Sequence, residues 1–145
     1  MGTYDITVSG GNDNNYAFSL INGTLTVEKA TLNASAVDTT RNYGGPNPEF
    51  RIEYTGFVND EDYSVLDELP IASTSADINS EVGDYNITLS GGNDNNYTFT
   101  LAYGTLSIDK AILNASAVDT TRNYGEPNPE FRIEYAGFVN GEDYS

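Results

Sequence analysis

The chain has 145 residues and a formal net charge of −16, with 22 acidic and only 6 basic side chains. So few basic residues argue against nucleic acid and against anionic membrane surfaces as partners. The absence of Cys and His removes disulfides, thiolate metal sites and the usual nucleophile–base pairs of enzymes. No apolar run is long enough to span a membrane, so we expect no membrane insertion, while a hydrophobic content of 38% supports a packed core.

Two short strands are predicted near the start of the chain. Tyr4–Ser9 ("YDITVS") and Tyr16–Leu20 ("YAFSL") alternate apolar or aromatic residues with polar ones, which is the period of a half-buried antiparallel strand. Between them, Gly10–Asn15 ("GGNDNN") has turn chemistry. The Asn22-Gly23 pair lies between two alternating runs and predicts a hairpin.

The alternation then changes phase. Leu25 and Val27 are odd-numbered, whereas Leu32 and Ala34 are even-numbered, and neither Gly nor Pro lies among the residues Glu28–Thr31. A change of phase without Gly or Pro predicts a strand that leads directly into the next domain. We therefore place a repeat boundary within this segment.

The remaining elements are also short. Gly44–Pro48 ("GGPNP") predicts a turn, Glu49–Tyr54 ("EFRIEY") predicts a strand, and Asp60–Leu69 predicts at most one helical turn. Many short strands separated by turns predict an all-β fold. We expect small antiparallel β-sandwich (immunoglobulin-like) repeats in tandem, with β-grasp-like or single-layer β units as alternatives.

The chain contains an internal repeat. The phrase "RNYGGPNPEFRIEYTGF" at Arg41–Phe57 returns as "RNYGEPNPEFRIEYAGF" at Arg122–Phe138, 81 residues later. We expect residues 1–30 to be the closing part of a preceding repeat, 31–111 a complete repeat, and 112–145 the opening part of a following one. The alternative division has two units, 2–64 and 83–145, joined by residues 65–82 as a linker.

The repeated text resembles a known family. "YGGPNPEFRIEYTGFVNDED", followed by "VGDYNITLSGGNDNNYTFTLAYGTLSIDKA", is similar to the MBG-type repeat of bacterial surface proteins. The positions that carry the resemblance are Tyr43, Gly44, Asn47, Pro48, Gly56, Phe57, Gly83, Tyr85, Ile87, Asn96, Tyr97, Gly104, Leu106, Ile108, Lys110 and Ala111. The resemblance implies a stalk-like module of an extracellular or cell-surface adhesin-like protein, usually without an assigned ligand.

One segment has the composition of a cation site. Asn59, Asp60, Glu61 and Asp62 form a compact oxygen-rich loop, and oxygen ligands suit calcium. The second copy reads Asn140, Gly141, Glu142 and Asp143, with one carboxylate fewer. Calcium bound by residues 59–62 is the metal hypothesis, and no organic cofactor is predicted.

The other reactive side chains are interpreted as structural or solvent-exposed residues. Asp38, Glu49 and Glu53 offer carboxylates, but the two glutamates point outward on a predicted strand, so we predict no enzyme. Lys29 and Lys110 are the only lysines. An isopeptide bond at either of them is disfavoured, so we expect an intact mass equal to the sequence mass.

Two functions from different classes follow. The first is a non-catalytic structural stalk or spacer. The alternative is a module that binds glycan or protein through loops such as Gly10–Asn15 and Asn59–Asp62, with Tyr16 and Tyr97 as the aromatic contacts. The ligand of such a module is unknown.

The terminal parts are expected to associate. Tyr4 and Ile6 at one end, and Phe131 and Ile133 at the other, lie on apolar faces that lack their covering half. We therefore predict that the C-terminal part of one chain pairs with the N-terminal part of another. The alternative division into two self-sufficient units predicts a monomer.

Overall fold

The structure, a computed structural model, describes residues 1–144. Its regular elements are strands, together with one 3-10 turn, η1, at Tyr63–Val65, and no α-helix occurs in the described part of the chain. The strands are β1 (Gly2–Ile6), β2 (Gly23–Val27), β3 (Ala30–Ala36), β4 (Thr39–Asn42), β5 (Ile52–Thr55), β6 (Glu68–Thr74), β7 (Gly83–Asn93), β8 (Tyr97–Ala102), β9 (Gly104–Asp109), β10 (Asn114–Ala117) and β11 (Ile133–Ala136). The predicted all-β fold is confirmed, as is the single helical turn within Asp60–Leu69.

The chain divides into two compact units, each made of three segments. The first unit comprises Met1–Ser35, Glu53–Ile71 and Leu89–Ala102. The second comprises Ala36–Ile52, Ala72–Thr88 and Tyr103–Ser145. This division by contacts cuts across the repeat boundaries, so those boundaries stay a prediction.

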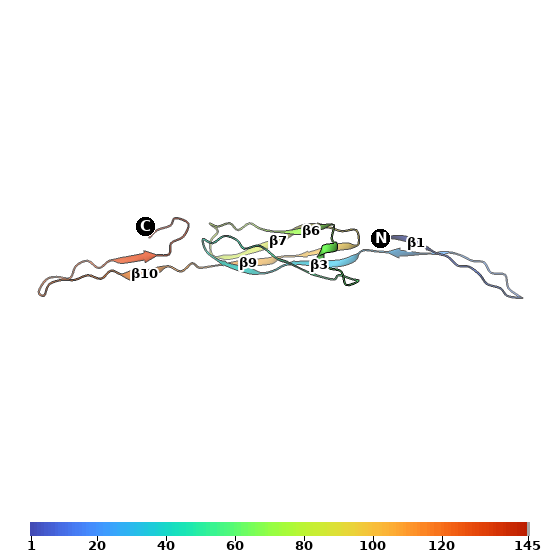
Figure 1. Ribbon diagram of the computed structural model, residues 1–145, viewed down its shortest axis with the longest axis horizontal. Coiled ribbons are helices and arrows are strands. Elements are labelled where there is room, and N and C mark those ends of the chain that lie inside the picture. The colour runs from blue at the N-terminus through green and yellow to red at the C-terminus, as the bar shows by residue number, and fades with distance from the viewer. Residues whose placement is uncertain (145) are drawn as a thin grey trace. The chain divides into compact units, whose positions relative to one another are not determined.

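The first unit is organised around β3, which is labelled in Figure 1. It is the central strand of a sheet with the order β5-β3-β8. Strand β3 pairs in parallel with β8, in the register from Ala30↔Tyr97 to Ser35↔Ala102. Leu32 and Ala34 alternate with polar residues and are fully buried. In the same unit, β1 and β2 form a separate antiparallel pair.

The second unit is organised around β9, which lies between β4 and β7 in a sheet with the order β4-β9-β7-β6. Strand β9 is parallel to β4 and antiparallel to β7. Its alternate residues Leu106 and Ile108 are buried, and Ile87 of β7 is buried with them. Strands β10 and β11 form a further antiparallel pair in this unit.

Two of these pairings are parallel rather than antiparallel as expected. They join β3 to β8 and β4 to β9, strands that lie far apart in the sequence. Alternation shows which face of a strand is buried, but it carries no information on the direction of the neighbouring strand. The sequence pattern therefore placed these strands without fixing their orientation.

The hairpin predicted at Asn22-Gly23 is wrong. Strand β2 begins at Gly23 and pairs with the distant β1, and in the second copy Tyr103 separates two strands of different sheets. Neither Gly23 nor Gly104 has the positive φ that a two-residue hairpin turn uses. At Gly104 the glycine serves close packing instead, because an added Cβ would lie 2.5 Å from the Ala36 carbonyl oxygen.

The predicted strands form only where a partner is present. The predicted strands Tyr4–Ser9 and Glu49–Tyr54 overlap β1 and β5 in part, but Tyr16–Leu20 is not a strand. Its copy 81 residues later is β8, which pairs with β3. The prediction for Tyr16–Leu20 is therefore wrong because no strand is available beside it, not because its sequence is unsuited to a strand.

Candidate functional site

The predicted calcium loop is a tight turn. Asn59 and Asp60 have φ values of 57° and 58°, in the left-handed region, and the Glu61 amide donates to the Val58 carbonyl at 3.1 Å. Asp62 caps η1, because its Oδ1 accepts a hydrogen bond from the Ser64 amide at 2.8 Å. Hydrogen bonds from the Ser64 side chain and from its amide lower the pKa of the Asp62 carboxyl.

Glu61 in this loop is hydrogen-bonded to Tyr97. The Tyr97 hydroxyl donates to Glu61 Oε2 and accepts from the Val58 amide at 3.1 Å, and the hydrogen bond to Glu61 raises the pKa of Tyr97. The Tyr97 ring is 2% exposed and meets the Phe57 ring edge-on, with 5.4 Å between centroids. Tyr97 is thus a packing residue that holds the loop in place.

The loop residues do not converge on a cation position. Within residues 1–144, no group of three or more Asp, Glu, His or Cys side chains is arranged to hold a metal ion. Glu61 and Asp62 each accept a hydrogen bond from the protein itself. Calcium binding at Asn59, Asp60, Glu61 and Asp62 stays a prediction.

The second copy of the loop has the same backbone turn but different neighbours. Asn140 has a φ of 55°, and the Glu142 amide donates to Val139 at 3.0 Å, as in the first copy. Here, however, Glu142 Oε1 accepts a hydrogen bond from the Tyr43 hydroxyl, which raises the pKa of Tyr43. The loop therefore contacts residues of the preceding copy of the sequence.

Two further contacts fix this loop. The Asn140 side-chain amide donates to the Ile78 carbonyl at 3.3 Å. Val139 packs against Gly44 so closely that a Cβ at Gly44 would lie 2.5 Å from Val139 Cγ2. We call this set of contacts, from Tyr43, Gly44 and Ile78 to Val139, Asn140 and Glu142, the C-terminal joint.

A corresponding arrangement lies in the first unit, which we call the N-terminal joint. It encloses a pocket of about 340 Å³ lined by residues that include Met1, Ala30, Val58 and Glu61. The pocket at the C-terminal joint, of about 260 Å³, is lined by the residues 81 positions further on: Val82, Ala111, Val139 and Glu142. The two pockets are therefore lined by the same positions of the repeat, whereas the contacts of Tyr43, Gly44 and Ile78 are found only at the C-terminal joint among the described residues.

Lys29 lies beside the N-terminal joint. Its Nζ donates to the Asp94 carbonyl at 2.7 Å, and Asp94 itself is 4% exposed. Lys29 thus donates this hydrogen bond to a backbone carbonyl and not to a side-chain amide or carboxyl. The expected unmodified mass for Lys29 and Lys110 stays a prediction.

The carboxylates considered for catalysis are only partly brought together. Asp38 and Glu49 line one pocket with Arg51, whereas Glu53 does not line it. Asp38 Oδ1 accepts a hydrogen bond from the Thr105 amide at 2.7 Å, which gives it a structural role.

Tyr16 and Tyr97, the two proposed aromatic contacts for a ligand, differ sharply in exposure. Tyr16 is 76% exposed, whereas Tyr97 is buried. An aromatic surface built from both copies alike is therefore not present.

These strands and joints define a small all-β module. Residues 32–107, more than half of the chain, match the MBG domain (YGX type) family. The chain belongs to this family, which confirms the resemblance found in the sequence. Comparisons with curated proteins and with solved structures give no match. Among residues 1–144 there is no helix with the length and apolar character needed to cross a membrane.

Sequence reasoning missed the role of Tyr43, Gly44 and Glu142. Tyr43 and Gly44 were recognised only as parts of a family motif, and Glu142 only as part of a weakened copy of a calcium loop. No signal in the sequence singles out Glu142, because Asn59, Glu61 and Asp62 all return in the second copy of the loop as Asn140, Glu142 and Asp143.

Proposed function

We propose that the chain is a non-catalytic structural spacer of a bacterial cell-surface or secreted adhesin-like protein. Its membership of the MBG domain family supports a surface-protein module. The observation that carries the spacer role is the C-terminal joint. There the Tyr43 hydroxyl bonds Glu142, and Gly44 contacts Val139, so one copy of the sequence holds the next by specific contacts.

The connections at the joints are also short. Two residues, Glu28 and Lys29, lie between β2 and β3, and residues 110–113 lie between β9 and β10. A spacer transmits position only if its modules do not swing freely, and short connections with packed contacts limit such motion. Flexible Gly/Ser linkers would have the opposite effect.

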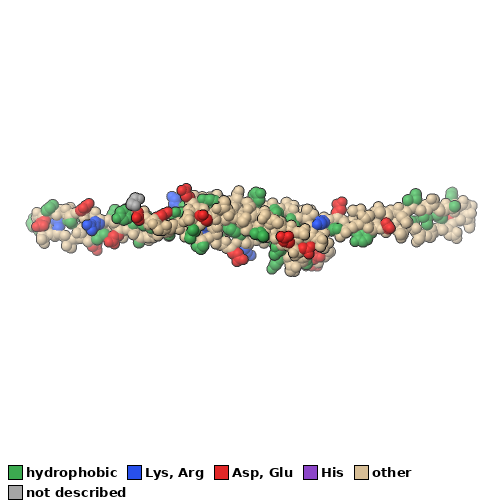
Figure 2. All heavy atoms as spheres, turned by 90° about the horizontal axis from the view of Figure 1, so that it is seen from above, with side chains coloured by type: hydrophobic (Ala, Val, Ile, Leu, Met, Phe, Trp, Pro, Cys, Tyr) green, Lys and Arg blue, Asp and Glu red, His purple; other side chains and the backbone are tan. Residues whose placement is uncertain are grey.

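The surface chemistry agrees with a spacer. The chain carries a net charge of −16, and on the face drawn in Figure 2 the acidic side chains are spread out and not gathered at one place. Like charge on successive modules disfavours folding back within a Debye length of about 8 Å at physiological salt. The proposal needs no ligand and no catalytic group.

The test is to measure length against repeat number. We would prepare chains with one, two and three further 81-residue periods and determine their maximum dimension by small-angle X-ray scattering. A spacer predicts a constant increment per period, since each joint repeats the same contacts. A dimension that grows as the square root of the number of periods, as for a flexible chain, would contradict it.

A glycan array addresses the binding alternative with the same chains. The spacer proposal predicts no saturable binding. Saturable binding that is lost on Tyr16→Ala would instead support a ligand-binding module.

A further inference from the structure

The terminal parts expose residues whose copies are buried. Leu32 is 0% exposed and its copy Leu113 is 46% exposed, while Ile87 is 0% exposed and its copy Ile6 is 51% exposed. Likewise Tyr97 is 2% exposed and Tyr16 is 76% exposed. The same side chains in the same local sequence are thus covered in one place and uncovered in the other. Among the described residues, neither terminal part has beside it the strands that cover the corresponding side chains of the central copy.

We propose that residues 112–144 of one chain dock with residues 1–27 of a second copy of the chain and rebuild the strand pairings that are seen within residues 31–111. The occupant of each exposed face is identified by the chain itself, because the central repeat shows which strand covers which. The inference does not depend on the spacer role, because it concerns only the exposed apolar faces of residues 1–27 and 112–144.

Both halves already have the required conformation. The β1–β2 pair has the register Tyr4↔Leu25, which matches Tyr85↔Leu106 between β7 and β9. In the C-terminal part the Val118 amide donates to the Arg132 carbonyl at 3.0 Å, as Val37 donates to Arg51 at 3.0 Å. Preformed halves lose less conformational entropy on docking than disordered segments would.

The central repeat also fixes the register of the docked strands. The parallel pair β3–β8 places Ala111, Leu113 and Ala115 opposite Tyr16, Phe18 and Leu20 of the second copy, respectively. The parallel pair β4–β9 places Thr120 and Arg122 opposite Leu25 and Val27 of the second copy. Tyr16–Leu20 would then become the strand that its sequence predicts.

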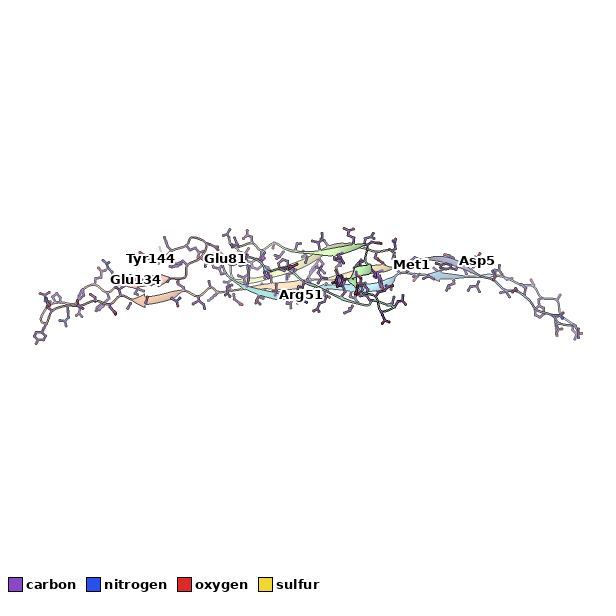
Figure 3. The ribbon with its side chains drawn as sticks, viewed as in Figure 1. Met1, Asp5, Arg51, Glu81, Glu134 and Tyr144 are labelled. Carbon is purple, nitrogen blue, oxygen red and sulfur yellow. The ribbon has the colours of Figure 1, made fainter. Side chains whose placement is uncertain are left out.

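An aromatic cluster in the C-terminal part is ready for this partner. The ring of Tyr135 contacts those of Phe138 and Tyr144, with 6.3 Å and 5.8 Å between the centroids, respectively. Tyr144 is labelled in Figure 3. They are copies of Tyr54, Phe57 and Tyr63, which pack in the same way beside Tyr97. Tyr16 of the second copy would occupy the position of Tyr97.

The carboxylate at this position can accept both tyrosines. Glu142 uses Oε1 for the Tyr43 hydroxyl, whereas Glu61 uses Oε2 for Tyr97. Docking would therefore add the hydroxyl of the second copy's Tyr16 at Oε2 and leave the C-terminal joint intact.

Among the strands of the central repeat, only the edge strand β6 has no copy in the rebuilt domain. Residues 112–144 and 1–27 contain copies of β3, β4, β5, β7, β8 and β9, but none of β6. Strand β6 lies at the edge of the sheet β4-β9-β7-β6. The central strand β9 and both of its neighbours are represented, so the rebuilt sheet keeps its middle.

The first test is sedimentation velocity over a concentration series, with matched variants. We expect the mass to rise with concentration from 15.7 kDa to at least twice that value. Leu113→Asp and Phe18→Asp should each abolish the rise. Their controls, Asn114→Asp and Ser19→Asp, place the same charge at the neighbouring outward position, since the copies Asn33 and Thr100 are exposed, and should keep it.

Mixing the two defective variants tests the direction of docking. Leu113→Asp keeps a functional N-terminal face, and Phe18→Asp keeps a functional C-terminal face, so an equimolar mixture should form a dimer although neither variant does so alone. Nonspecific sticking of apolar faces would not restore association in this way. A wild-type chain that stays monomeric, association unaffected by either variant, or a mixture that stays monomeric would each overturn the proposal.

Discussion

At the scale of single residues, the internal copies provide comparisons in which side chain and local sequence are held constant. Leu32 and Leu113 both follow an Ala-x pair, but only Leu32 is buried. The difference in burial, rather than the residue type, should decide the cost of truncation.

We predict that Leu32→Ala lowers the free energy of unfolding by about 2–5 kcal/mol, because it leaves a cavity in a packed core. Leu113→Ala should cost far less in dilute solution, since that side chain is half exposed. Urea denaturation of both variants at a concentration where the chain is monomeric gives the comparison. Equal losses would show that the C-terminal part is covered in a way that the structure does not contain.

The Tyr43–Glu142 pair makes the C-terminal joint sensitive to alkaline pH. The pKa of Tyr43 is raised in the folded chain, chiefly by its hydrogen bond to Glu142, so the protonated phenol is the bound form. Its stabilising contribution is fully present below the ordinary tyrosine pKa of about 10 and is lost as pH rises through the higher folded value.

The amide resonance of Val139 should report this loss. We expect its chemical shift to move towards that of an undocked loop above about pH 10, and Tyr43→Phe to remove the transition. Tyr124→Phe is the control, because Tyr124 is the copy of Tyr43 and its side chain is fully exposed. An unchanged transition in Tyr43→Phe would assign the titration to another group.

At the scale of elements, a strand needs its neighbour as well as its sequence. The alternating pattern correctly predicted β1 and β5, and it also marked Tyr16–Leu20, which is not a strand here. The same pattern 81 residues later forms β8 beside β3. Pattern alone could not give the parallel directions of β3–β8 and β4–β9, because direction depends on how distant segments meet.

The candidate site was harder to predict than the strands. The tight turn at Asn59–Asp62 is visible in its composition, but the sequence does not show that Glu61 faces Tyr97 or that Glu142 faces Tyr43. Such contacts arise between positions that are brought together only by folding. The composition of the loop predicts a cation, which stays a prediction, whereas the contacts of its glutamate with a tyrosine hydroxyl, Tyr97 in the first copy and Tyr43 in the second, come only from the structure.

The two glycines at the start of β2 and β9 test close packing of strands. We predict that Gly104→Ala destabilises the fold, because the new Cβ would lie 2.5 Å from the Ala36 carbonyl oxygen. Gly23→Ala, at the copied position, should be tolerated, since its nearest neighbours would be Ile6 side-chain atoms at 3.8 Å and beyond. Thermal unfolding of both variants checks this. A tolerated Gly104→Ala would mean that Gly104 and the Ala36 carbonyl approach each other less closely than described.

At the scale of the whole molecule, charge repulsion opposes the proposed association between chains, whereas burial of exposed apolar side chains favours it. Acidic residues outnumber basic ones in residues 1–27 and in residues 112–144, so docking of one part on the other brings like charges together. We predict that raising the salt concentration strengthens the proposed association, because added ions screen the repulsion and leave apolar burial intact. Sedimentation at low and high salt measures this, and association that weakens with salt would contradict docking through apolar faces.

The central claim is that neighbouring copies of the sequence are held by a specific joint. Gly44 and Gly125 are copies with positive φ, 76° and 87°, so alanine strains both backbones alike. Only at Gly44 would the new Cβ also meet Val139, whereas at Gly125 nothing lies within 4 Å. A comparison of Gly44→Ala with Gly125→Ala therefore separates loss of the joint from backbone strain.

The most direct measurement is the distribution of distances between spin labels at Thr40 and Ser116, attached through introduced cysteines in a chain that has none of its own. Pulsed electron resonance should give a narrow distribution in the native chain and in Gly125→Ala, and a broad one in Gly44→Ala. A broad distribution in the native chain, or one that Gly44→Ala leaves unchanged, would contradict a specific joint and with it the spacer function.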